Sequence, residues 1–433
     1  MHQVGFPAEQ IRQLIPQAGC AAAVGEQGNV CGFVNDRKVV VAMQNTDRLY
    51  GIASYPRAGN TIASQAREKQ ELDMRAAIMR NRQMIADEIA APEPGPGEVL
   101  VKTLACGICG SDLHAFEHFD QFTAQDGGFA STLDAGKDLV MGHEFCAEIV
   151  DFGPGDAPPG RLAVGTRVCS MPTLIRNAAG VAVGYSNDVP GGYAEQMLLN
   201  EMLLLPVPNG LPDDHAALTE PMAVGLHAVE KASLTADDVP LVIGCGPVGL
   251  AVIAALRLKG ARPIIAADFS PARRALAEVM GADIVIDPAE RSPYDSWRQA
   301  ARASEQGARA PVNPLSGERM LPPGVYFECV GVPGVIDQMM VGAERGCRFV
   351  VVGVCMESDP IRPLLAIGKE LSLQFVLAYT PEEFAITLHH IAEGEIPVAP
   401  LITGHVDVAG VAQAFKDLKN PEAHAKIVVE PWR

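Results

Sequence analysis

The sequence is short of positive charge and carries no concentration of basic residues. Its 433 residues include 34 Lys and Arg against 52 Asp and Glu, which gives a formal net charge of −18. A surface this acidic repels the phosphates of nucleic acids and of anionic membranes. We therefore expect neither a nucleic-acid partner nor a membrane partner.

Cysteine is also sparse, and ten in the whole chain are too few for a domain stapled by disulfides. No secretory leader is recognisable after Met1, so we expect a cytoplasmic protein with reduced thiols. A functional cysteine is then a metal ligand or a nucleophile. Residues 239–256 lack charge over nearly the length of a membrane-spanning helix. They contain two prolines and three glycines, however, so a buried strand, a turn and a helix explain them better.

The chain length suggests two or three domains, and the sequence pattern divides it further. Residues 1–73 carry seven acidic and seven basic residues and no motif. We interpret them as an appended N-terminal segment, either disordered or an upstream stretch mistaken for coding sequence. Short apolar runs broken by Gly and Pro predict a β-rich domain over 74–226. Alternating strands and helices predict a parallel sheet over 227–378, with a polar surface excursion at 287–323. Residues 379–433 add a helix and a terminal strand.

A glycine-rich turn lies between an apolar strand and an expected helix. It runs through Gly244, Gly246, Pro247, Val248 and Gly249, the spacing and context of a dinucleotide-binding loop. The first glycine permits a tight turn, and the second lets a pyrophosphate approach the backbone. The third lets the helix and the strand pack closely. The helix N-terminus then offers unpaired N–H groups to the phosphates.

Asp268 ends the next apolar run, 19 positions after Gly249. A carboxylate there can accept hydrogen bonds from the adenosine ribose and would repel a 2′-phosphate, so NAD is favoured over NADP. Arg273 and Arg274 follow, and either could compensate a phosphate, which weakens the preference. The competing interpretation is a glycine-rich packing turn with a surface aspartate, but strand, helix and acid occur here together.

Thiol, imidazole and carboxylate side chains occur at Cys109, His143, Glu144 and Glu220. These are the ligand types of a catalytic zinc that keeps one position open. Cys106 and Cys109 also form a Cys-x-x-Cys pair, so a redox pair or a four-cysteine structural zinc is an alternative. No βαβ pattern adjoins the pair, and the chain has no second Cys-x-x-Cys. The spacing alone leaves a metal site and unpaired core residues about equally supported.

With these residues in hand, the chain resembles the zinc-dependent medium-chain dehydrogenases, such as the alcohol, polyol and threonine dehydrogenases. The likeness covers about residues 74–433 and rests on four motifs in the right order. They are Cys-Gly-Ser-Asp-x-His at 109–114, Gly-His-Glu at 142–144, Glu-Pro at 220–221, and the glycine turn with its acid. The resemblance implies an α/β fold in which a GroES-like β-rich catalytic domain carries an inserted Rossmann domain. The C-terminal residues return to the catalytic domain, and the active site lies in the cleft.

The resemblance also assigns the metal ligands. Cys109 and His143 match firm zinc ligands, and Glu144 or Glu220 completes the shell, with exchange between the two during turnover. The spacing between Cys109 and His143 is longer than is usual in the family. The extra residues, 120–137, are expected to line or cover the substrate pocket.

Three further residues receive roles by the same resemblance. Ser111 matches the hydroxyl that relays the substrate proton, and His114 matches the outer member of that relay. Arg273 matches a residue that reaches the adenosine end of the cofactor. The family's structural zinc needs four closely spaced cysteines, whereas this chain has only Cys146 and Cys169 in that region. We therefore expect one catalytic zinc and no structural zinc.

The resemblance implies an oxidoreductase that moves hydride between an alcohol or polyol, or the matching carbonyl, and NAD(P). Zinc would act as a Lewis acid on the substrate oxygen. One alternative is a zinc-free quinone or enoyl reductase of the same superfamily. Another is a non-catalytic NAD-binding redox sensor. The expected partners are a small-molecule substrate and further copies of the chain in a homodimer or homotetramer.

Overall fold

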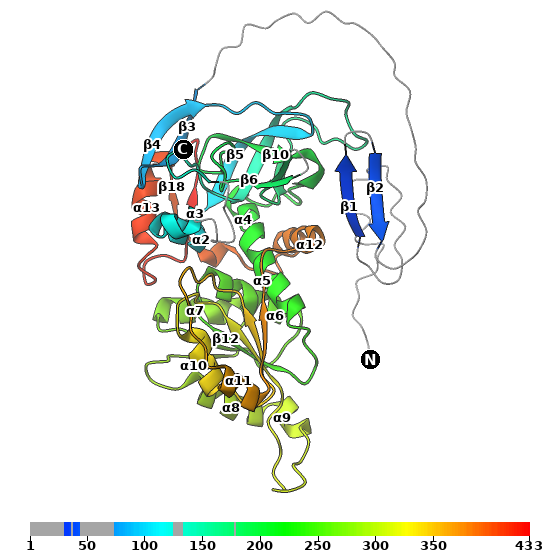
Figure 1. Ribbon diagram of the computed structural model, residues 1–433, viewed down its shortest axis with the longest axis vertical. Helices are drawn as coiled ribbons and strands as arrows, with labels where there is room; N and C mark the ends of the chain where they lie inside the picture. The colour runs from blue at the N-terminus through cyan, green and yellow to red at the C-terminus, as the bar shows by residue number, and fades with distance from the viewer. Residues whose placement is uncertain (1–29, 36–37, 44–72, 124–132, 177–178) are drawn as a thin grey trace, which may run out of the picture.

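A computed structural model describes residues 30–35, 38–43, 73–123, 133–176 and 179–433 of the chain. Figure 1 shows two halves, each built on a sheet, stacked along the long axis of the molecule. We refer to them as the β-rich half and the parallel-sheet half. Both the β-rich core and the C-terminus lie in the upper part of this view.

The predicted appended segment, residues 1–73, is described only in part. β1 (Val30–Asn35) and β2 (Lys38–Met43) pair as an antiparallel ribbon. The other residues before Asp73 lie outside the described part of the chain. The interpretation of this segment as an appendage therefore stays a prediction.

The β-rich half is organised around one seven-stranded sheet. Its order is β11-β7-β6-β5-β19-β18, and β10 also pairs with β5. The strands are β5 (Glu98–Gly107), β6 (Glu144–Phe152), β7 (Arg167–Ser170), β10 (Gln196–Asn200), β11 (Leu204–Pro206), β18 (Ile402–Val406) and β19 (Lys426–Val429). The last strand of the chain thus pairs with β5, where Val428 is opposite Gly107. This pairing brings the C-terminal residues beside the Cys-x-x-Cys segment.

Smaller elements complete the β-rich half. Two hairpins are formed by β3 (Asp73–Arg80) with β4 (Gln83–Ala90) and by β8 (Thr173–Arg176) with β9 (Ala179–Ala182). The helices are α2 (Gly110–Glu117), α3 (Phe119–Thr123), α4 (Asp213–Ala217), α5 (Thr219–Lys231), α12 (Pro381–Ala392) and α13 (Val411–Asp417). Because Met141, Tyr193, Met197 and other large side chains are buried together here, this half has a core of its own.

The second half contains a six-stranded parallel sheet with the order β14-β13-β12-β15-β16-β17. Its strands are β12 (Val239–Ile243), β13 (Ile265–Ala267), β14 (Ile284–Ile286), β15 (Gly324–Glu328), β16 (Arg348–Val351) and β17 (Ser372–Phe375). Its helices are α6 (Pro247–Leu258), α7 (Pro271–Met280), α8 (Pro293–Ala303), α9 (Glu305–Arg309), α10 (Val335–Gly342) and α11 (Pro363–Lys369). The order reverses at β12, as in a doubly wound sheet.

Both faces of this sheet are buried. Successive strand residues point to opposite faces, so Val242 packs with α6 in one core cluster while Leu241 packs in another. The second cluster contains Trp297 of α8 and Met339 of α10. Helices therefore cover both faces, which explains the unbroken apolar strands and confirms the predicted α/β fold class.

The expected surface excursion at 287–323 is wrong for its first half. These residues include α8, whose Trp297 is fully buried and donates a hydrogen bond from Nε1 to the carbonyl of Val239 at 3.1 Å. The segment is polar because one face of α8 meets solvent, and its few apolar side chains are spaced to reach the sheet. The average polarity of the segment hid this amphipathic pattern.

Residues 239–256 form β12, the glycine turn and most of α6, as their glycines and prolines indicated. Among the residues that the structure describes, no helix combines the length and the apolarity needed to cross a membrane.

Candidate active site

The candidate metal ligands are brought together by the pairing of β5 with β6. Gly107 near the end of β5 lies opposite Glu144 at the start of β6, and His143 directly precedes that strand. A Cβ atom on Gly107 would overlap the Glu144 carboxylate, so a side chain at this point would displace that carboxylate. Two residues further on, Cys109 forms the N-cap of α2.

Cys109, His143 and Glu144 each offer one ligand atom, and these atoms all lie within 4.8 Å of one another. Thiolate, imidazole and carboxylate are the donor set that zinc accepts at a catalytic site with an open fourth position. The residues present therefore fit a zinc ion. In the described part of the chain this is the one such group of three or more ligand-type side chains.

A buried carboxylate, Asp112, contacts both Cys109 and His143. It accepts the backbone N–H of Cys109 at 3.2 Å and lies 3.3 Å from Nδ1 of His143. It also accepts the hydroxyls of Tyr185 at 2.7 Å and Tyr193 at 2.6 Å. Because the Asp112 carboxylate lies beside Nδ1, the other imidazole nitrogen is available to a metal ion, as in many histidine–metal sites.

The pKa values in the cluster show how crowded its charges are. Burial and the neighbouring Glu144 raise the pKa of the Cys109 thiol. Burial lowers the pKa of His143, but Asp112 and Cys109 outweigh that effect and raise it well above its usual value. A cation between these groups would reverse both shifts, because it favours the thiolate and the neutral imidazole.

Glu144 is tied to a lysine from the end of the chain. Nζ of Lys426, in β19, donates to the two carboxylate oxygens of Glu144 at 2.8 and 2.7 Å and to the carbonyl of Ile108 at 3.0 Å. Both side chains are almost completely buried. Burial lowers the pKa of Lys426, but Glu144 and Cys109 raise it overall. Nothing in the sequence near Lys426 indicated this role.

Glu220, the fourth predicted ligand, lies outside the three-residue cluster. It occupies the first turn of α5 and is buried, which raises its pKa to about 7. The charges of His143 and Glu144 reach it, and its carboxylate is hydrogen-bonded by Tyr379. Glu220 is thus a second buried carboxylate beside the cluster, held by a different partner.

The two predicted relay residues lie on α2. Ser111 Oγ is 2.9 Å from the hydroxyl of Tyr185. His114 follows one turn later, and its ring hydrogen-bonds the backbone of Val354, in the loop after β16 of the parallel-sheet half. Burial lowers the pKa of His114, and its Nδ1 is buried without a hydrogen-bond partner. α2 therefore connects the metal cluster to the other half of the molecule.

The glycine turn has the geometry that its spacing predicted. Gly244 has φ +91°, a value that side-chain-bearing residues rarely adopt. Gly246 is the N-cap of α6, and Pro247 occupies its first turn. A Cβ on Gly249 would overlap the carbonyl of Gly244, so the third glycine allows α6 to start against β12. Val248 lies in the first turn of α6, whose unpaired N–H groups can meet a phosphate.

Asp268 closes this site from the end of β13. Its carboxylate accepts the backbone N–H of Cys245 at 2.7 Å and that of Ser270 at 2.8 Å. Nη1 of Arg273 lies 4.0 Å from Asp268, and the buried Nε of Arg273 has no hydrogen-bond partner. The acid and the arginine therefore both border the glycine turn, and their roles toward the adenosine end of a cofactor stay a prediction.

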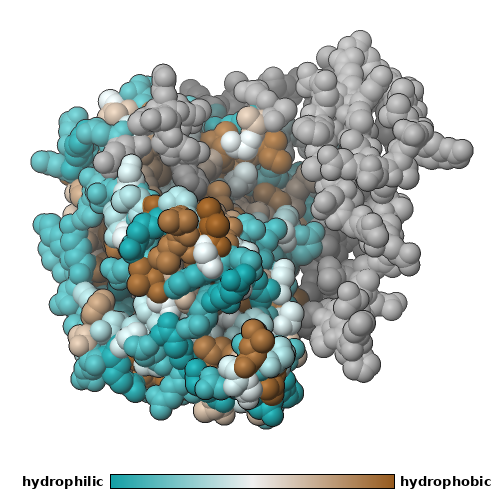
Figure 2. All heavy atoms as spheres, turned by 60° about the horizontal axis from the view of Figure 1, so that its bottom comes forward, coloured by the Kyte–Doolittle hydropathy of each residue, from teal (hydrophilic) through white to brown (hydrophobic). Residues whose placement is uncertain are grey.

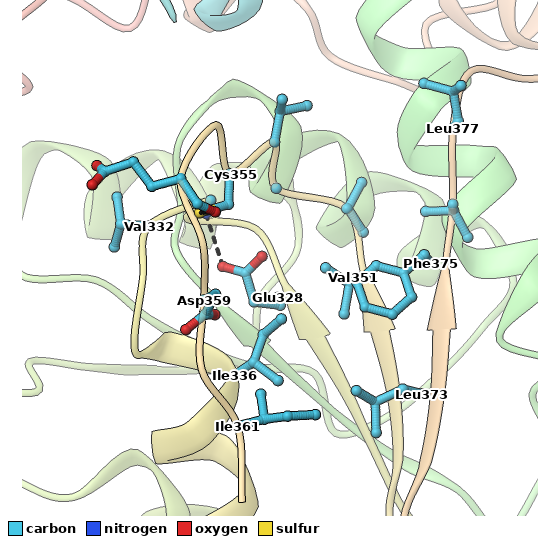
Figure 3. Close-up of a pocket in the computed structure, with 16 residues that line it drawn as sticks. Glu328, Val332, Ile336, Val351, Cys355, Asp359, Ile361, Leu373, Phe375 and Leu377 are labelled. Carbon is cyan, nitrogen blue, oxygen red and sulfur yellow. Dashed lines mark hydrogen bonds between the residues drawn. The ribbon is translucent and has the colours of Figure 1, made fainter. Parts of the chain in front are cut away.

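A cavity of about 490 Å³ opens at the carboxyl ends of β15, β16 and β17. Figure 3 shows its lining, with Glu328 hydrogen-bonded to the loop that follows β15 and with Phe375 and Leu377 along one wall. Glu328 accepts the N–H groups of Val330 and Gly331 at 2.8 and 2.9 Å. No ligand of the metal cluster lines this cavity.

A candidate metal cluster and a glycine turn of the dinucleotide-binding type occur together on one chain. This combination is typical of an enzyme that uses a metal ion and a nucleotide cofactor.

Comparison with known proteins identifies the class. The alcohol dehydrogenase GroES-like domain matches residues 95–209, and the zinc-binding dehydrogenase family matches residues 247–393. The (R,R)-butanediol dehydrogenase of Bacillus subtilis (strain 168) is 31% identical over 368 residues, which cover 83% of this chain and 100% of that protein. The erythritol/L-threitol dehydrogenase of Mycolicibacterium smegmatis is 34% identical over 334 residues, covering 73% of this chain and 86% of that protein.

A solved structure agrees with these relatives. A zinc-binding dehydrogenase from Sinorhizobium meliloti 1021, crystallised with NADP, has a TM-score of 0.66 and 26% identity and covers 83% of this chain and 100% of that one. The chain belongs to the zinc-dependent medium-chain dehydrogenases/reductases. It is an oxidoreductase of the alcohol dehydrogenase type that acts with zinc and a nicotinamide cofactor. The predicted family and enzyme class are thereby confirmed, and neither a zinc-free reductase nor a redox sensor is supported.

Proposed function

We propose that this chain oxidises a hydroxyl group of a vicinal diol or a polyol to the carbonyl, with NAD as the hydride acceptor and one zinc ion. The observation that carries the proposal is the cluster of half-buried Cys109 with buried His143 and Glu144, and Ser111 lies two residues beyond the cysteine. The choice of substrate class is supported by the butanediol and erythritol dehydrogenases, which are at least 30% identical to this chain.

When bound, zinc supplies a Lewis acid for the substrate oxygen, and NAD supplies the hydride acceptor. Cys109, His143 and Glu144 hold the metal in this proposal, and Asp112 orients the imidazole. Glu220 provides a second carboxylate that can replace Glu144 as a ligand. Burial raises its pKa to about 7, so a nearby cation would favour its charged form.

The chain's own proton acceptors lie on α2. Ser111 accepts the hydrogen bond of the substrate hydroxyl, and His114, one turn further along the helix, is the outer acceptor of the proton. His114 suits this role because its ring reaches the loop after β16, where the two halves meet. A histidine that is neutral at physiological pH can take up a proton there.

The preference for NAD over NADP is supported by the contacts of Arg273 and Arg274, the two residues that could bind a 2′-phosphate. Arg274 donates to the carbonyls of Asp268 and Phe269 at 2.8 Å and forms an ion pair with Asp287 at 2.9 Å. It is therefore engaged elsewhere. Arg273 is left to border the glycine turn, but the Asp268 carboxylate lies beside it and opposes a 2′-phosphate.

The proposal of a single zinc is supported by the surroundings of the two cysteines in β6 and β7. The thiol of Cys146 donates to Asp213 at 3.7 Å, and that of Cys169 donates to the carbonyl of Ala216 at 3.2 Å. Both side chains are buried against α4. They serve packing here, and no further cysteine of the described residues accompanies them.

The zinc-loaded protein should oxidise 2,3-butanediol, erythritol and other diols faster than ethanol, and faster with NAD than with NADP. Initial rates of NADH or NADPH formation over a panel of alcohols measure both preferences. Replacing Asp268 with Ala should lower the ratio of NAD to NADP rates by about tenfold, since one charge repulsion is worth about 1–2 kcal/mol. Equal rates with both cofactors in the wild-type protein would contradict the assignment of Asp268.

We further propose that the protein is a homodimer that pairs through the edge of the parallel sheet. β17 is the terminal strand of that sheet, and its Phe375 is 63% exposed. Leu364, Ile367 and Leu377, on neighbouring segments, are also exposed. Figure 2, which turns the bottom of Figure 1 toward the viewer, shows hydrophobic patches on an otherwise largely hydrophilic face. An unpaired apolar edge strand favours pairing with a second copy.

Replacing Phe375 with Asp should convert the dimer into a monomer, because it places a charge in the apolar contact. Light scattering coupled to gel filtration measures the mass of each species. Leu315→Asp is the matched control, since Leu315 is 96% exposed in the same half and lies between α9 and β15 in the chain, outside β17. A monomeric wild-type protein, or equal masses for wild type and Phe375→Asp, would remove the proposed interface.

A further inference from the structure

A tyrosine that the sequence did not single out connects the predicted proton acceptor to the buried carboxylate. The hydroxyl of Tyr185 lies 2.9 Å from Ser111 Oγ and 2.7 Å from Oδ1 of Asp112. Its ring lies against the imidazole of His143, with 5.2 Å between the ring centroids, and against Phe122 at 5.3 Å. Tyr185 therefore contacts three residues of the site. They are Ser111, the buried carboxylate Asp112 and the candidate metal ligand His143.

The partners of Asp112 fix the direction of these hydrogen bonds. Asp112 accepts a backbone N–H and the hydroxyl of Tyr193 on Oδ2, while Oδ1 faces Tyr185 and His143. A carboxylate in this role only accepts, so Tyr185 uses its single proton for Asp112. The oxygen of Tyr185 can then only accept from Ser111.

The hydrogen bond of Tyr185 to Asp112 in turn fixes the orientation of the Ser111 hydroxyl. Two hydroxyl oxygens 2.9 Å apart share one proton, and here Ser111 must supply it. With its proton directed at Tyr185, the hydroxyl of Ser111 presents its lone pairs elsewhere. A serine in this orientation accepts a hydrogen bond from a substrate hydroxyl and does not compete with it as a donor.

We propose that Tyr185 is a positioning residue that sets the Ser111 hydroxyl as a hydrogen-bond acceptor for the substrate alcohol. This inference rests on the proposed function, in which Ser111 accepts the hydrogen bond of the substrate hydroxyl. When Ser111 takes up that proton, it releases its own proton, which turns from Tyr185 and passes to His114, the outer acceptor. Tyr185 itself does not contact the substrate oxygen in this scheme. Tyr185 accepts the Ser111 proton, so Ser111 does not donate it to the substrate. The Ser111 oxygen is therefore already oriented as an acceptor before the substrate binds.

Tyr193 provides an internal comparison for this role. It donates to the other oxygen of the same carboxylate at 2.6 Å and is fully buried, whereas Tyr185 is partly buried. The hydroxyl of Tyr193 contacts Asp112 and not Ser111. Removing either phenol deprives Asp112 of one hydrogen bond of the same kind. Only the loss of the Tyr185 hydroxyl leaves Ser111 without a fixed acceptor.

The test is a double-mutant cycle on the zinc-loaded enzyme with its best diol from the substrate panel. Tyr185→Phe should lower kcat about 10- to 100-fold and change KM less than about threefold, because a positioned acid–base group contributes about 10²–10⁴-fold. Ser111→Ala should lower kcat at least as much. In the Ser111→Ala background, Tyr185→Phe should cost less than about twofold, since Tyr185 acts through Ser111.

Further measurements separate positioning from a merely structural role. The solvent deuterium isotope effect on kcat should rise in Tyr185→Phe and stay at the wild-type value in Tyr193→Phe. Ser111→Thr keeps a hydroxyl, so in that background the effect of Tyr185→Phe should reappear. Zinc content and NADH affinity, measured by metal analysis and nicotinamide fluorescence, should match the wild type in Tyr185→Phe.

Three results would overturn the inference. They are independent, multiplying effects of Tyr185→Phe and Ser111→Ala, equal isotope effects in the two tyrosine variants, or loss of zinc from Tyr185→Phe. These outcomes differ from failure of the proposed function. If the wild-type protein oxidises no alcohol on the panel, the function itself is wrong and the cycle is not reached.

Discussion

Replacing Cys109 with alanine should lower kcat by roughly 10³-fold or more while NADH binding stays within about twofold of wild type. The thiol is one of three ligand atoms that lie within 4.8 Å of one another, so its loss leaves two protein ligands for zinc. The metal supplies several kcal/mol of charge stabilisation, and each 1.36 kcal/mol is a factor of ten in rate. Steady-state kinetics, zinc content and nicotinamide fluorescence provide the three measurements.

Cys106→Ala is the matched control for this variant. Cys106 is a buried cysteine three residues earlier, and it lies outside the group of ligand atoms. This variant should keep its zinc and most of its activity. If it loses zinc to the same extent as Cys109→Ala, the metal is held by the Cys-x-x-Cys pair and the proposed ligand set is wrong. Equal loss of turnover and of NADH binding in Cys109→Ala would also contradict the separation of the two sites.

The second large effect is expected for Lys426→Met, which should lower the free energy of unfolding of the metal-free protein by about 3–5 kcal/mol. The substitution leaves the carboxylate of Glu144 buried without its lysine partner, and an uncompensated buried charge costs about this much. Urea unfolding followed by circular dichroism measures the change. The metal-free protein is used because a bound cation would replace the missing positive charge.

The double variant Lys426→Met/Glu144→Gln tests the cause. It removes both charges, and replacing a whole buried ion pair is often close to neutral. Most of the lost stability should therefore return. A single variant within about 1 kcal/mol of wild type would show that Glu144 is not dependent on Lys426. A double variant no more stable than the single one would assign the loss to packing around β19.

The parallel-sheet half could be predicted from the sequence because its turns and helix starts depend on residues that are close together in the chain. Gly244, Gly246 and Gly249 each answer a backbone requirement set by residues within a few positions along the chain. Ser270 makes a similarly local contact, because as the N-cap of α7 it accepts the backbone N–H of Arg273 at 3.1 Å. The polar segment containing Trp297 was misjudged because composition was averaged over a helix with one buried face.

Only part of the candidate metal site could be predicted from the sequence. The ligand types and their order along the chain are sequence properties, and so is the resemblance that gave Cys109, His143, Glu144 and Glu220 their roles. Which carboxylate lies within reach of the thiol and the imidazole depends on the pairing of β5 with β6. That pairing places Glu144 in the cluster and leaves Glu220 on α5, outside it.

The sequence by itself determined the family, the α/β architecture and the candidate side chains for a zinc and a dinucleotide, because motif spacing and periodicity are properties of short stretches of chain. The tertiary structure alone decided which partners complete the site. Lys426 reaches Glu144 across 282 positions of sequence, and Tyr185 reaches Ser111 across 74. Contacts of such range depend on strand pairing and loop packing, and no local pattern of residues encodes them.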